Sequence, residues 1–235
     1  MNNLIEEIKK ACQDLFSEKL IITSLSGAER SFIISGNDLS PALNNHNGTP
    51  EKINALKWFQ EFWIYIEINF KQVVVESKFP SRFDKSDRQA YFDKLKVEYL
   101  EINNEYFNVI ISISVFQGDY QIETKKQLFR AEWDNYEDNK FHPQPHWHFY
   151  PEKDTTFDIE DNLKEFETDD NNDFTEVETK KEIDLKRMHF AINGQWAQNG
   201  VHIHKINDSK LLVNWLSGVL RHIKDQLEKT KTLKL

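Results

Sequence analysis

The sequence predicts an α+β fold: a predominantly antiparallel β-sheet flanked by N-terminal and C-terminal amphipathic helices, with an acidic insertion. Three observations support this prediction: strand-like runs that follow one another without helices between them, apolar stripes at helical spacing near both ends, and a highly charged stretch at residues 152–184. Successive strands without intervening helices favour antiparallel pairing. We expect residues 1–235 to form a single domain, since a chain of this length can bury one large core.

Two segments have the periodicity of amphipathic helices. The first is residues 3–18, whose apolar side chains gather on one face. The second follows a predicted Asn207-Asp208 cap and carries a continuous apolar stripe: Leu212, Trp215, Leu216, Val219, Leu220, Ile223 and Leu227. A shorter helix is expected from Ser86 to about Leu95, because Ser86 and Gln89 form a capping-box pattern.

Runs rich in β-branched and aromatic residues predict the strands. They lie at residues 20–24, 30–35, 95–102, 107–116, 127–134, 146–150 and 188–192. Residues 36–49 contain many Asn, Gly and Pro and are expected to form a loop, after which Thr49-Pro50 is typical of a helix start. Residues 59–76 match both helical and strand spacing, so we expect a short helix followed by a strand.

Cysteine content and hydropathy limit the class of protein. The single cysteine, Cys12, excludes a disulfide within the chain and a Cys-rich metal site, and its place on an apolar stripe predicts a core residue. We expect a reducing, cytoplasmic location. The most apolar window, residues 62–70, is about half as long as a membrane helix and contains Glu67, so no membrane segment is expected.

The charge is concentrated in one segment. Residues 152–184 contain 14 acidic and 4 basic residues, a formal charge of −10, whereas the whole chain carries −9. The rest of the chain is therefore close to neutral, and the overall acidity does not exclude an anionic substrate. We interpret the segment as a solvated insertion that could engage a basic surface of a protein partner.

A histidine cluster is the chemically unusual part of the sequence. Three of the eight histidines lie in H-P-Q-P-H-W-H, residues 142–148. If residues 146–150 form a strand, His146 and His148 project from the same face while Trp147 points to the other. The preceding strand alternates in the same way, with Arg130, Glu132 and Asp134 opposite an apolar face formed by Phe129, Ala131 and Trp133. Antiparallel pairing of the two strands would bring Glu132 or Asp134 close to His146 or His148.

This set of side chains suits two chemistries. As metal ligands, His146 and His148 with Glu132 and Asp134 could hold a divalent ion such as Zn²⁺ or Mn²⁺, and His189 on a further predicted strand could complete the site. Without metal, the two imidazoles could act as general acid and base beside the carboxylates, while Arg130 neutralises a developing negative charge. Both chemistries predict a hydrolase of the phosphodiesterase or nuclease type, with nucleic acid as its substrate.

Three other interpretations remain open at this stage. His–carboxylate pairs on adjacent strands are often structural hydrogen bonds, and the acidic insertion fits a noncatalytic accessory subunit. The aromatic-rich composition would also suit a binder of small ligands. His202 and His204 form a second H-x-H pair that lacks nearby carboxylates, whereas His46 and His222 are expected to be solvated. The sequence does not indicate an oligomeric state.

Overall fold

The computed structural model describes residues 1–25, 30–46, 49–73, 85–120, 125–134, 146–150 and 206–232. The helices are α1 (Asn2–Cys12), the 3-10 helix η1 (Gln13–Leu15), α2 (Lys85–Glu98) and α3 (Ser209–Thr232). The strands are β1 (Ile21–Leu25), β2 (Arg30–Ser35), β3 (Leu39–His46), β4 (Thr49–Phe59), β5 (Phe62–Gln72), β6 (Leu100–Ile102), β7 (Glu105–Gln117), β8 (Lys126–Asp134) and β9 (His146–Phe149).

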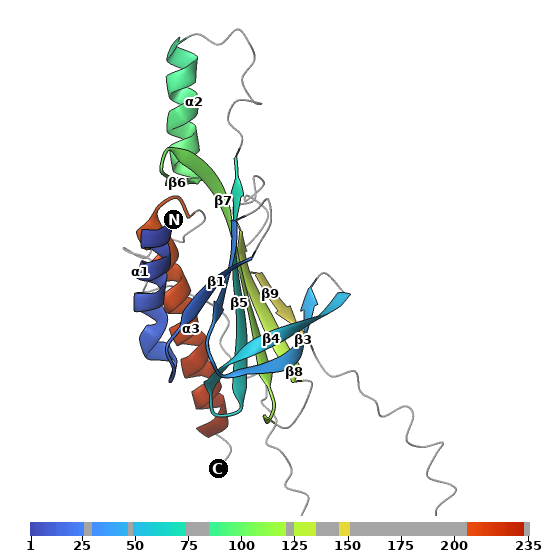
Figure 1. Ribbon diagram of the computed structural model, residues 1–235. Helices are drawn as coiled ribbons and strands as arrows, with labels where there is room; N and C mark the ends of the chain where they lie inside the picture. The colour runs from blue at the N-terminus through green and yellow to red at the C-terminus, as the bar shows by residue number, and fades with distance from the viewer. Residues whose placement is uncertain are drawn as a thin grey trace, which may run out of the picture.

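All described strands belong to one antiparallel sheet, as predicted. Its main path runs β1-β2-β5-β7-β8-β9, while β6 pairs with β7. The edge of β5 is shared, because β4 pairs with its first residues (Leu56 with Ile64) and β2 pairs with its later ones (Ile34 with Ile66). The β3–β4 hairpin therefore leaves the plane of the sheet (Figure 1). It crosses the face opposite to helices α1 and α3, which we call the second face.

Helices α1 and α3 lie side by side on the first face of the sheet (Figure 1). That face presents the alternating apolar residues of the central strands, including Ile66 of β5, Ile113 of β7 and Trp133 of β8, all buried in the main core. The apolar stripe predicted for the C-terminal helix packs there too, and Trp133 contacts Trp215 with ring centroids 6.2 Å apart. Asp208 caps α3 by accepting a hydrogen bond from the Lys210 amide at 2.6 Å, which confirms the predicted helix start.

A smaller apolar cluster holds the hairpin against the second face. Ala42 of β3 and Ala55 of β4 pack against three aromatic residues of the sheet: Trp63, Tyr65 and Phe116. The small alanine side chains allow the hairpin to approach the sheet closely, since interiors are packed without large voids. The second face is thus partly apolar under the hairpin, and it becomes polar farther along the strands.

The structure corrects the prediction for residues 36–59. The expected loop contains the strand β3, and Thr49-Pro50 begins the strand β4 instead of a helix. Residues 62–72 form a continuous strand, because β5 finds hydrogen-bonding partners along both of its edges. Proline is tolerated in β3 and near the start of β4, where the ladder does not require its missing N–H.

Other predictions differ in their bounds. The helix expected to end near Leu95 extends to Glu98, so only Leu100–Ile102 remains of the strand predicted over residues 95–102. The turn after it is a two-residue hairpin, in which Asn103 and Asn104 adopt positive φ angles of 52° and 64°. The strand predicted at 188–192 and the acidic segment 152–184 lie outside the described residues. Within the described residues, no helix has the length and apolar character that crossing a bilayer requires.

The Cys12 thiol should be unreactive in the folded protein. Cys12 is fully buried, and burial, followed by the negative charge of Asp14, raises the pKa of the thiol to about 12. Because the thiolate is the reacting form, we expect a disulfide reagent at pH 8 to label folded protein roughly 100-fold more slowly than unfolded protein. Spectrophotometric thiol assays with and without denaturant measure this ratio, and equal rates would contradict the burial.

Candidate functional site

The end of strand β3 is fixed to β7 and β8 by buried hydrogen bonds. The Asn44 side-chain oxygen accepts hydrogen bonds from Ser114 Oγ at 2.7 Å and from Gln127 Nε2 at 3.1 Å. The Gln127 side-chain oxygen accepts the Asn45 backbone N–H at 2.7 Å. Asn44, Ser114 and Gln127 are all buried, so each bond also satisfies a group that would otherwise be costly to bury.

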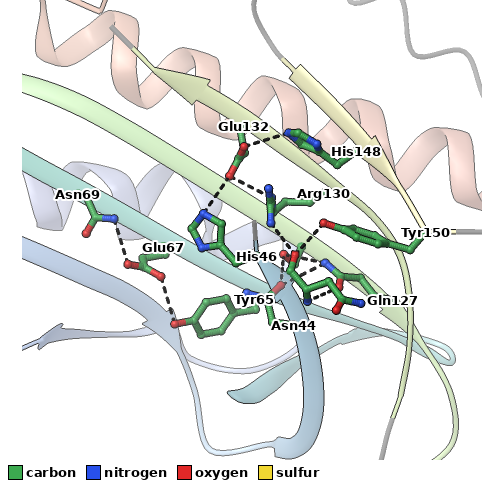
Figure 2. Close-up of polar contacts among 12 residues, drawn as sticks. Asn44, His46, Tyr65, Glu67, Asn69, Gln127, Arg130, Glu132, His148 and Tyr150 are labelled. Carbon is green, nitrogen blue, oxygen red and sulfur yellow. Dashed lines mark hydrogen bonds and ion pairs between the residues drawn. The ribbon is translucent and has the colours of Figure 1, made fainter. Parts of the chain in front are cut away.

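Two further donors converge on the Asn45 carbonyl oxygen. Arg130 Nη1 donates to it at 2.5 Å, and the Tyr150 hydroxyl donates at 2.7 Å (Figure 2). A carbonyl oxygen has two lone pairs, so both donors can be accommodated. Because these contacts fix residues 44 and 45, the next residue, His46, lies at a fixed position beside β8.

His46 and His148 lie on either side of the Glu132 carboxylate, as Figure 2 shows. His148 Nε2 is 3.1 Å from Glu132 Oε2, and His46 Nε2 is 3.6 Å from Glu132 Oε1. The two imidazoles are 45% and 44% exposed, whereas the Glu132 side chain is 17% exposed. The arrangement places two accessible proton-transfer groups around one sheltered carboxylate.

Arg130 supports this carboxylate from the interior. Its side chain is 2% exposed, and its Nε atom lies 2.9 Å from Glu132 Oε1. That contact is an ion pair without a hydrogen bond, because the geometry of the Nε–H does not meet the requirement for one. Arg130 is therefore placed to balance the charge of Glu132 and to hold Asn45, and its guanidinium is not presented to solvent.

The structure brings together some of the predicted site residues. The predicted pairing of the two strands is confirmed, with Arg130 opposite His148 and Glu132 opposite His146. Asp134 is buried and lies opposite Ile110 of β7. The side chain of His146 and the whole of His189 lie outside the described residues, as do His142, His202 and His204.

The predicted metal site remains a prediction. Within the described residues, no group of three or more His, Cys, Asp or Glu side chains is arranged to hold a metal ion. The side chain of His146 and the whole of His189, two of the five predicted ligands, lie outside the described residues. We therefore derive no chemical step through a metal.

His46 was missed as a site residue from the sequence. It was expected to be solvated in a loop, but it lies at the end of β3 and contacts Glu132 of β8. The buried positions of β3 are Ser40, Ala42 and Asn44, while Leu39 is 39% exposed. Because this strand places small and polar residues inward, its hydrophobic pattern gave no signal that His46 belongs to a sheet.

Comparison of the chain with protein-family models, with curated proteins and with solved structures found no match.

The hydrogen bond from Tyr150 should stabilise the protein up to high pH. Burial raises the pKa of the Tyr150 hydroxyl above its ordinary value of about 10. The positive charge of Arg130 acts in the opposite direction but is the smaller effect. The neutral hydroxyl is thus favoured in the folded state, and its stabilising effect is present below pH 10 and is lost as the pH rises through the folded pKa. We expect Tyr150→Phe to lower the free energy of unfolding by about 1 kcal/mol near neutral pH.

Urea unfolding of wild type and Tyr150→Phe at several pH values measures this difference. It should stay constant up to about pH 10 and shrink above it. A difference that grows with pH above 10 would contradict the assignment of Tyr150 as a hydrogen-bond donor.

Proposed function

We propose that the protein is a phosphodiesterase that cleaves RNA by general acid–base catalysis. One observation carries the proposal: the Glu132 carboxylate lies between the half-exposed imidazoles of His46 and His148. In each imidazole, Nε2 faces the carboxylate, which leaves Nδ1 available to exchange a proton with a substrate. Glu132 orients both rings and stabilises whichever of them is protonated.

The local charge is suited to a phosphate group. The Arg130 guanidinium, 2.9 Å from the Glu132 carboxylate, offsets the negative charge of that carboxylate. With one imidazole protonated, the group formed by His46, Arg130, Glu132 and His148 carries a net charge of +1. This positive charge lies on the protonated imidazole, which is half-exposed, so an anionic phosphodiester can approach it.

The proposed reaction uses the ribose hydroxyl as the nucleophile. The neutral imidazole removes the proton of the 2′-hydroxyl, whose oxygen attacks the adjacent phosphorus. The protonated imidazole donates its proton to the 5′-oxygen as the P–O5′ bond breaks. The products are a 2′,3′-cyclic phosphate and a free 5′-hydroxyl, and the two imidazoles have exchanged protonation states.

Loss of either imidazole should reduce the rate strongly. We expect His46→Ala and His148→Ala each to lower kcat/KM for RNA cleavage by roughly 10²–10⁴-fold, because each removes one of the two proton-transfer groups. Glu132→Gln should have a smaller effect, since both imidazoles remain. Cleavage of fluorogenic oligoribonucleotides measures these rates, and His222→Ala on α3 serves as a matched control that should keep the wild-type rate.

Two further comparisons test the mechanism. The oligodeoxyribonucleotide of the same sequence should not be cleaved, because it lacks the attacking hydroxyl, and RNA cleavage should persist in EDTA. Activity that is the same in wild type, His46→Ala and His148→Ala would refute the proposal. Cleavage of DNA that EDTA abolishes would instead favour a metal-activated water at these residues.

A further inference from the structure

Glu67 is a half-buried carboxylate in the middle of the second face of the sheet, and it has no cationic partner among the described residues. It lies on β5, where its Oε1 accepts a hydrogen bond from Asn69 Nδ2 at 3.0 Å and its Oε2 accepts one from the Tyr65 hydroxyl at 3.4 Å (Figure 2). None of the described Lys, Arg or His side chains pairs with it. A partly desolvated carboxylate without a compensating cation is unfavourable for folding, so another reason is needed for its presence.

Glu67 lies in the same row of side chains as the proposed catalytic group. It is directly opposite Ser112 of β7, and Ser112 is directly opposite Glu132 of β8. Side chains at directly paired positions share a face of the sheet. Glu67 is therefore two strand spacings, roughly 9.5 Å, from Glu132.

The same face holds two other acceptors that lack donors within the described part of the chain. The side-chain oxygens of Asn69 and Asn108 are buried, and no described residue donates a hydrogen bond to them. Asn69 is two residues after Glu67 on β5, and Asn108 is opposite Lys71, so both share the face of Glu67. The described residues around Glu67 thus supply more acceptors than donors, and no nearby buried N–H of these residues is left over to neutralise the carboxylate.

The free lone pairs of Glu67 select the kind of donor. Each carboxylate oxygen has already accepted one hydrogen bond, which leaves one lone pair on each for a ligand. Two parallel N–H groups would bind both oxygens together. Among the four RNA bases, only guanine presents two adjacent donors, N1–H and N2–H, on its Watson–Crick edge.

We propose that Glu67 is a base-recognition residue that selects guanosine at the nucleotide whose phosphate is cleaved between His46 and His148. The inference rests on the proposed function, since it takes the scissile phosphate to lie at the two imidazoles. The extent of one nucleotide, from its phosphate to the far edge of its base, matches the two strand spacings between Glu132 on β8 and Glu67 on β5. Ser112, between them, lies beneath the ribose.

Dinucleoside phosphates with different first bases test the selection. GpA should be cleaved roughly 10- to 100-fold faster than ApA, CpA or UpA, as expected for one bidentate contact with a base. IpA, whose hypoxanthine base lacks the N2 amino group, should fall between them. In Glu67→Gln the ratio of the GpA rate to the ApA rate should fall to about one, whereas Glu6→Gln on the exposed face of α1 is a control that should keep the wild-type ratio.

A binding measurement distinguishes failure of the inference from failure of the proposed function. Titration of the full-length protein with guanosine 3′-monophosphate and adenosine 3′-monophosphate, followed by calorimetry, does not depend on turnover. Tighter binding of the guanosine compound that Glu67→Gln abolishes supports the inference, even if no RNA is cleaved.

Three results would overturn it. RNA cleavage without a base preference, or with a preference that Glu67→Gln does not change, refutes guanine selection and leaves the catalytic proposal standing. Absence of both cleavage and guanosine binding refutes both proposals. Binding of arginine amide at Glu67 in place of guanosine would assign the carboxylate to a guanidinium of a protein partner.

Discussion

The candidate site depends on how the last residues of β3 are held against β7 and β8. Asn44 and Asn45 bind Ser114, Gln127, Arg130 and Tyr150 through buried and part-buried hydrogen bonds. These bonds compensate for the loss of water around the polar groups, and they can form only when the hairpin lies across the sheet. Without them, His46 would have no fixed relation to Glu132, and the second imidazole of the site would be lost.

The two faces of the sheet have different roles: one carries the apolar core, and the other carries the proposed catalytic groups. The first face, covered by α1 and α3, holds nearly all the large apolar side chains, so the stability of the fold comes mainly from that side. The second face is covered only in part by the alanine-lined hairpin, and it carries Glu67, Ser112, Glu132 and His148. A rigid strand pair is a suitable scaffold for such groups, because packing on the opposite face fixes their positions.

The sequence predicted the parts of the fold in which local pattern and tertiary environment agree. The stripe from Leu212 to Leu227 and the run from residue 107 to 116 became α3 and β7, because most of their buried residues are apolar. The alternation of Arg130, Glu132 and Asp134 likewise located the polar face of β8 and its pairing with β9. Only local side-chain order was needed for these results.

The sequence-based prediction was wrong where the buried residues are polar or small instead of hydrophobic. In β3 the inward residues are small or polar, and their partners lie about 70 to 85 positions away in the sequence, so no local window contains the reason for the strand. Arg130 shows the same limit. It was expected to neutralise a developing negative charge beside the two imidazoles, but the sequence does not place the hairpin that covers it, and it is buried beside Glu132.

The central claim is that one carboxylate, Glu132, contacts two imidazoles that separate parts of the chain supply. Side-chain ¹⁵N NMR of the histidines in wild type and Glu132→Gln tests it most directly, because the imidazole nitrogens respond to the charge of a contacting group. The resonances of both His46 and His148 should change in the variant, while those of His222 should not. A spectrum in which His46 is unaffected by the loss of the Glu132 charge would contradict the account.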